Sequence, residues 1–182
     1  MKKLNIYALI MTILFVSCSK DDDPVAVNEE EVITTLTVTL VPSDASANII
    51  LKTQDLDGDG PNAPVVTVTG GDLKASLTYA GSMKFENETE TPAENITLEI
   101  IEEADEHQVF YTVASSLNAT VVSSKNDSKG LPLGTEFNLT TGAASTGKLT
   151  FTLRHQPKKP NTGLADAGGS TDIEATFDLV IK

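Results

Sequence analysis

The sequence predicts a mainly β fold, an antiparallel β-sandwich of immunoglobulin-like or jelly-roll-like type with one inserted short helix. Short segments rich in threonine and valine recur at near-regular spacing, their apolar residues alternate with polar ones, and turn-forming residues separate them. The chain of 182 residues is long enough for one such domain with a substantial core. We therefore divide it into a signal peptide (1–17), a flexible acidic tether (18–30) and a single sandwich domain (31–182).

Each strand is predicted from its own pattern. Leu149, Phe151 and Leu153 alternate strictly with polar residues, which is typical of a strand with one buried face. The strands 108–114 and 119–123 are close enough in sequence to form a pair. By the same reasoning we expect strands at 32–41, 47–53, 64–69, within 73–85, at 108–114, 119–123, 136–140, 147–155 and 172–181, with a Pro- and Gly-rich loop at 156–170.

The inserted helix is predicted at residues 92–106. Thr91, Pro92 and Glu94 have the spacing of a capping box with proline at the first helical position. The apolar residues of 96–100 also alternate with polar ones, so a strand is the alternative for this segment.

The N-terminus resembles the signal of a bacterial lipoprotein. Two lysines precede an apolar run, Leu4 to Val16, and Ser17-Cys18 follows it. The run is shorter than the roughly 20 residues of a membrane-spanning helix. The resemblance implies cleavage before Cys18, acylation of that residue and anchoring by acyl chains such as palmitate. Phe15 stands where such signals usually carry leucine, and an ordinary secretory signal ending in a lone cysteine is the alternative.

Residues 19–23, Ser-Lys-Asp-Asp-Asp, resemble the export signal of surface lipoproteins in Bacteroidetes-type bacteria. This resemblance implies a lipid-anchored protein of the cell outer membrane that is exposed on the cell surface. The alternatives are the periplasmic face of that membrane, or a solvated tether whose like charges keep it extended.

The segments 55–64 and 87–108 resemble a group of uncharacterised lipoproteins of the same bacteria, some of them labelled as a type 1 periplasmic-binding fold. That fold needs two lobes of alternating strands and helices, which the Thr/Val alternation does not supply. We therefore expect the sandwich.

Composition limits the function. A formal net charge of −13 argues against nucleic acid as a partner, because phosphate binding needs clustered Lys and Arg. Cys18 is the single cysteine, so disulfides within the chain are excluded. The sequence contains no Gly-x-Ser-x-Gly, His-Glu-x-x-His or phosphate-binding loop motif, so we do not expect an enzyme.

A calcium loop is predicted at Asp55, Asp57 and Asp59. Carboxylates at alternate positions, followed by Gly60, match the first half of an EF-hand loop, and calcium takes six to eight oxygen ligands. Val66 stands where an EF-hand has its last glutamate, so the candidate is a loop of another kind between strands. The alternative is an acidic turn, because Asp and Gly are good turn formers.

A zinc site is the second prediction. Glu103 and His107 lie four apart and share a face if the segment is helical, and a sandwich could bring His155 near them. Two imidazoles and a carboxylate suit zinc. The alternative is that both histidines are surface residues, with His107 complementing the C-terminal dipole of the helix.

These observations lead to one main functional expectation and two alternatives. We expect a non-catalytic, lipid-anchored envelope protein that acts as a binding or accessory module, with an outer-membrane transporter as partner and calcium rigidifying the Asp55 loop. The first alternative is capture of a small ligand or of zinc. The second is a structural or adhesive surface protein.

Overall fold

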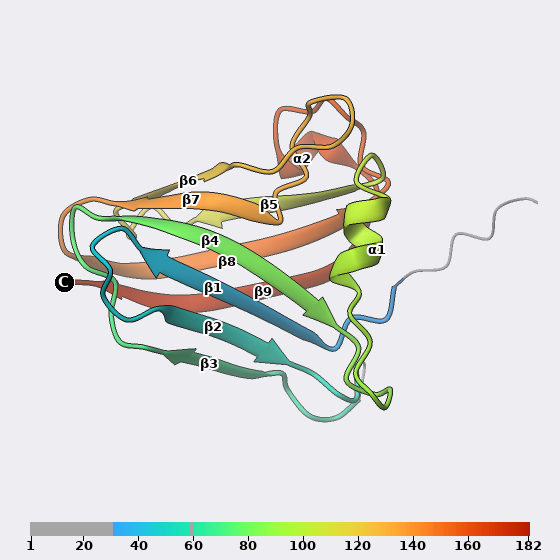
Figure 1. The fold of residues 1–182 in the computed structure, drawn as a ribbon, viewed down its shortest axis with the longest axis horizontal. Helices are drawn as coiled ribbons and strands as arrows, with labels where there is room; N and C mark the ends of the chain where they lie inside the picture. The colour runs from blue at the N-terminus through green and yellow to red at the C-terminus, as the bar shows by residue number, and fades with distance from the viewer. Residues whose placement is uncertain (1–30, 59) are drawn as a thin grey trace, which may run out of the picture.

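The structure is a computed structural model that describes residues 31–58 and 60–182. Within these residues the chain forms two antiparallel sheets with short helices in two of the connections (Figure 1). The predicted mainly β fold is therefore confirmed. The elements are β1 (Thr35–Pro42), β2 (Ile49–Gln54), β3 (Val65–Thr69), β4 (Thr78–Glu86), α1 (Thr97–Glu102), β5 (His107–Val113), β6 (Ala119–Ser123), β7 (Glu136–Thr141), β8 (Ser145–His155), α2 (Leu164–Ala167) and β9 (Ser170–Ile181).

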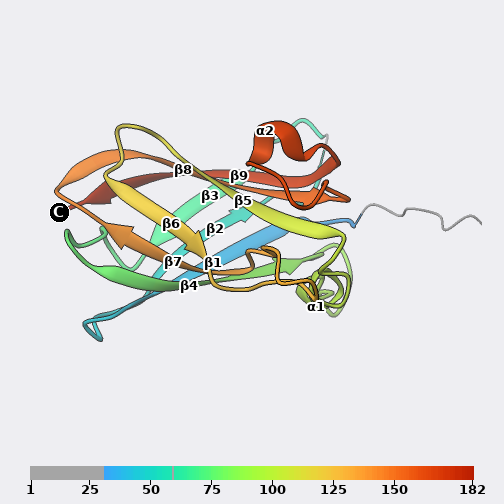
Figure 2. The same cartoon turned by 90° about the horizontal axis from the view of Figure 1, so that it is seen from above.

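The larger sheet has the strand order β3-β2-β1-β4-β7-β6, and the smaller sheet has the order β5-β8-β9. Alternation decides which face of each strand is buried: in β4, Tyr79, Met83 and Phe85 are buried, while Thr78, Ala80, Ser82 and Lys84 between and beside them are exposed. Figure 2 shows the two sheets as separate layers, and the core fills the space between them.

Aromatic rings join the two layers at the centre of the core. The Phe137 ring of β7 lies 5.7 Å from the Phe151 ring of β8, and Phe151 lies 6.0 Å from Phe177 of β9, centroid to centroid. Gly81 of β4 pairs with Phe137 and leaves room for its ring, since a Cβ at this position would lie 2.3 Å from a ring carbon. The core is thus packed so closely that position 81 has no room for a side chain larger than that of glycine.

The helix was predicted wrongly at its start and its end. It covers Thr97–Glu102 rather than 92–106, and Ile96 rather than Thr91 precedes it. Asn87 and Glu94 exchange two backbone hydrogen bonds of 3.0 Å, so the segment between them closes a loop. The backbone groups that a helix would need are therefore already used in this loop.

Two further predictions were wrong. The segments 108–114 and 119–123 do not pair with each other: β5 pairs with β8, and β6 pairs with β7. Alternation identifies a buried face, but it does not identify the partner strand. The loop 156–170 contains the short helix α2, whose four residues are too few to give a helical periodicity.

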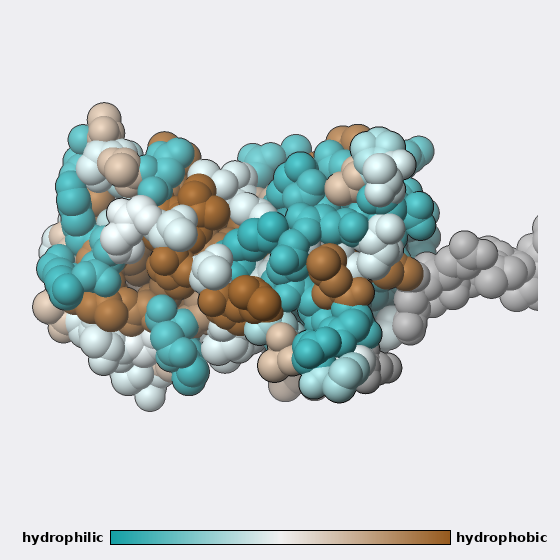
Figure 3. All heavy atoms as spheres, turned by 90° about the horizontal axis from the view of Figure 1, so that it is seen from below, coloured by the Kyte–Doolittle hydropathy of each residue, from teal (hydrophilic) through white to brown (hydrophobic). Residues whose placement is uncertain are grey.

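Strand β3 forms one edge of the larger sheet and is exposed along its whole length. Its side chains Val65, Val66 and Val68 are all exposed, and hydrophobic surface gathers on this side of the molecule (Figure 3). An open edge of this kind can pair with another strand.

No helix among the described residues is long and apolar enough to cross a membrane. The predicted signal peptide (1–17), the lipidated Cys18, the tether (18–30) and Asp59 lie outside the described residues. Acylation and anchoring therefore stay predictions.

Candidate metal centre

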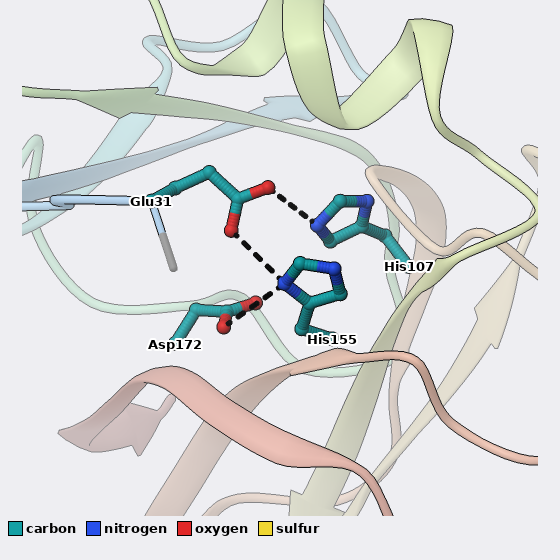
Figure 4. Close-up of side chains that lie close together, drawn as sticks. All are labelled: Glu31, His107, His155 and Asp172. Carbon is teal, nitrogen blue, oxygen red and sulfur yellow. Dashed lines mark ion pairs between the residues drawn. The ribbon is translucent and has the colours of Figure 1, made fainter. Parts of the chain in front are cut away.

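Four side chains from distant parts of the sequence converge at one end of the sandwich (Figure 4). They are Glu31, which precedes β1; His107, the first residue of β5; His155, the last residue of β8; and Asp172, near the start of β9. We call these four residues the candidate metal centre. The described chain begins at this end, where α1 and α2 also lie, and the C-terminus lies at the opposite end (Figure 1).

Strand pairing explains how the two histidines meet. The register of β5 against β8 places His107 directly opposite His155, and their ring centroids are 4.7 Å apart. Directly opposed residues in an antiparallel pair project from the same face of the sheet. Both rings are therefore directed into the interior at the end of the core.

A β-bulge directs Asp172 to the same place. Leu153 of β8 pairs with Ile173 of β9, but the next residue, Arg154, pairs with Thr171, so Asp172 is the extra residue. In a regular strand the side chain of Asp172 would point away from the face that carries Ile173. A bulge changes the direction of a side chain in this way, and here it brings the carboxylate toward His155.

The donor atoms lie close enough together for one metal ion to reach all four side chains after a small rearrangement. Oε1 of Glu31 lies 2.9 Å from Nε2 of His107, and Oε2 lies 3.4 Å from Nδ1 of His155. Oδ1 of Asp172 lies 4.0 Å from the same Nδ1, and one donor atom from each of the four residues lies within 4.8 Å of the others. A tetrahedral zinc ion with its usual bond lengths separates its donors by about 3.3–3.6 Å. A contraction of less than about 1.5 Å would complete such a shell.

All four side chains are shielded from water. The exposed fraction is 4% for the side chain of Glu31, 0% for His107, 4% for His155 and 0% for Asp172. Glu31 and Asp172 are half-buried as whole residues, because their backbone atoms are partly exposed while their side chains are not. A buried carboxylate needs a group of opposite charge near it, and a cation held between Glu31, Asp172 and the two histidines is one group that can fill this role.

The hydrogen bonds of His107 define the role of each ring nitrogen. Nδ1 lies 3.2 Å from the carbonyl oxygen of Glu103, which can only accept, so Nδ1 carries the proton and donates. Nε2 is buried and, among the described residues, makes no hydrogen bond, although it faces Glu31. A histidine whose second nitrogen donates to a backbone carbonyl is the usual arrangement of a metal ligand.

The surroundings of the candidate metal centre are negative. Burial, followed by the charges of Glu31 and Glu103, raises the pKa of Glu99 in α1 above its ordinary value. The neighbouring carboxylates among these causes are negative charges of the kind that attract a cation.

Two nitrogen and two oxygen donors determine the chemistry of the candidate metal centre. Imidazole and carboxylate ligands suit zinc and its divalent neighbours in the first transition series. Four protein ligands complete a tetrahedral shell and leave no position for water or substrate, which is typical of sites that hold a metal without catalysis.

The structure brings together part of the predicted zinc set. His107 and His155 meet, but Glu103 contributes a backbone carbonyl to His107 and its carboxylate does not belong to the cluster. Glu31 and Asp172 were not predicted. Glu31 adjoins the acidic tether, and Asp172 depends on a bulge, so no spacing in the sequence marks either residue.

The predicted calcium loop follows β2. Oδ1 of Asp55 accepts from the backbone N–H groups of Asp57 (3.3 Å) and Gly58 (3.0 Å). Oδ2 of Asp57 accepts from the side-chain amide of Asn62 (2.7 Å), which holds the pKa of Asp57 below its ordinary value. These contacts are those of a capped acidic turn. Asp59 lies outside the described residues, so calcium binding stays a prediction.

Comparison with protein-family models, with curated proteins and with solved structures finds no match to this chain.

Proposed function

We propose that this chain is a lipid-anchored protein of the bacterial outer membrane whose sandwich holds one divalent transition-metal ion, with zinc as the best match. The observation that carries this proposal is the convergence of Glu31, His107, His155 and Asp172 in a shielded cluster. The sequence alternative of zinc capture is thus favoured over the calcium-stabilised accessory module. The role as accessory to a transporter stays a prediction.

The metal is held and not used for catalysis. Four protein donors leave a tetrahedral ion without an open position, and a metalloenzyme needs such a position for water or substrate. The absence of catalytic motifs from the sequence agrees with this assignment.

Binding also depends on the fold. The four ligands come from four separate segments of the chain, and they meet only when β5, β8 and β9 are paired. The free energy of metal binding therefore stabilises the folded state.

The test is an equilibrium titration of the full chain, purified in detergent, with zinc in competition with a chromophoric chelator. We expect one zinc ion per chain, and loss of this binding in the double variant His107→Gln/His155→Gln. A matched pair on β9 separates the ligand from a general effect of charge: Asp172→Asn should weaken binding at least tenfold, while Asp178→Asn should not. Asp178 is exposed and paired with Lys148.

Circular dichroism of each variant checks that the fold is kept. Unchanged zinc affinity in the double histidine variant, or equal losses in the two aspartate variants, would contradict the proposal.

A further inference from the structure

An acidic groove adjoins the candidate metal centre. It has a volume of about 770 Å³ and lies between the loop after β2, the segment before β1 and the start of β9. Four of the residues that line the groove are acidic, and none of the lining residues is Lys, Arg or His. The acidic residues are Asp55, Asp57, Asp172 and Glu174.

Asp172 belongs to both the acidic groove and the candidate metal centre. Asp172 lines the groove through its backbone, because its side chain is fully shielded, and its carboxylate lies behind the groove wall and faces His155. On the other side, Val32 lines the groove and directly follows Glu31. The groove therefore reaches one of the four proposed ligands, Asp172, and the residue next to a second, Glu31.

The outer carboxylates of the groove are fixed in place. Asp55 and Asp57 are held by the turn contacts described above, and Oε2 of Glu174 accepts from the Thr152 hydroxyl at 3.0 Å. Arg154, the basic residue at this end of β8, donates to Thr171 and does not line the groove. A cleft lined by charges of one sign concentrates ions of the opposite sign and raises their rate of association.

We infer that the acidic groove is the route by which a divalent cation reaches the candidate metal centre. Asp55, Asp57 and Glu174 attract the ion from solution, and Asp172 receives it as the first ligand. This inference rests on the proposed function. It also gives the acidic loop a role in metal capture that does not require the loop to hold an ion itself.

The test measures the rate of cobalt(II) association with the full chain in detergent by stopped-flow absorbance. Two exposed apolar residues offer a matched pair of charge insertions, Leu56→Lys in the groove and Val122→Lys on β6. We expect Leu56→Lys to lower the association rate constant several-fold, up to about tenfold at low ionic strength, and Val122→Lys to leave it near the wild-type value. The dissociation rate constant should stay unchanged in both.

Charge removal gives a second measurement. The variant Asp55→Asn/Asp57→Asn should slow association, and Glu136→Gln/Asp178→Asn, which removes two charges elsewhere, should not. The difference should shrink at about 0.5 M salt, where the screening length falls to a few ångströms.

The outcomes separate this inference from the proposed function. Absence of cobalt binding by the wild-type chain would overturn both. Tight binding with equal association rates in all variants would overturn the route alone. A changed cobalt spectrum in Asp55→Asn/Asp57→Asn would show that the loop supplies ligands, and it too would overturn the route.

Discussion

Zinc should raise the melting temperature of this chain by an amount that the structure allows us to work out. Because the four ligands are separated along the sequence, the folded state binds the ion and the unfolded chain does not gather the same shell. At a free zinc concentration of 1,000 times the dissociation constant, selective binding stabilises the folded state by about 4 kcal/mol.

The size of the folded domain decides how large a temperature shift this free energy produces. For a domain of the size of residues 31–58 and 60–182, 1 kcal/mol moves the melting temperature by about 2–4 °C. We therefore expect saturating zinc to raise the midpoint by about 8–16 °C relative to chelator.

The assay is differential scanning calorimetry of the chain in detergent with zinc, with calcium and with chelator. The variant His107→Gln/His155→Gln should melt at the same temperature with zinc and with chelator. A shift below about 2 °C in the wild-type chain, corresponding to less than about 1 kcal/mol, would show that the folded state does not bind zinc selectively. An equal shift in the double variant would show that the two histidines do not hold the ion. The calcium arm tests the prediction for the Asp55 loop.

Three further predictions concern the fold. Gly81→Ala should lower stability by about 3 kcal/mol in urea unfolding, because the new methyl group overlaps the buried ring of Phe137; an unchanged midpoint would contradict this packing. Asp127 forms a shielded ion pair with Lys159 at 3.1 Å and also accepts from neighbouring backbone N–H groups. Burial alone would raise the pKa of Asp127, but these contacts together lower it. Asp127→Asn should therefore cost about 2–3 kcal/mol at pH 7, and the difference should disappear as the pH falls through that lowered pKa. Burial and neighbouring carboxylates raise the pKa of Glu99, so Glu99→Gln should be more stable than the wild type at pH 7 and equal to it below the ordinary pKa of about 4.5; equal stability at both pH values would contradict this.

The alternation of apolar and polar residues was sufficient to predict the positions of most strands. The alternation of Leu149, Phe151 and Leu153 predicted β8, whose three apolar side chains are buried at 0–1% exposure. The partners of the strands were harder to predict, because nothing in the segments of β5 and β6 shows that they belong to different sheets. The start of the helix was misplaced because the backbone pairing of Asn87 with Glu94 closes a loop across Thr91, where the capping pattern had predicted the first helical turn.

The candidate metal centre was predictable only in part. Histidine and carboxylate chemistry suggested His107 and His155 as a pair, and strand register then placed them opposite each other. Asp172 could not be predicted, because alternation directs it outward and one extra residue in β9 reverses that direction. Glu31 lies far from its partners in sequence, and nothing in the acidic segment around it distinguishes it from its neighbours.

X-ray absorption at the zinc edge, measured on the full chain loaded with one equivalent of zinc, identifies the atoms that bind the ion and their distances from it. We predict two imidazole nitrogens at about 2.0–2.1 Å and two carboxylate oxygens at about 2.0–2.2 Å, and we predict that this spectrum is lost in His107→Gln/His155→Gln. A shell of oxygens alone, or the same spectrum in the double variant, would contradict the assignment of zinc to Glu31, His107, His155 and Asp172.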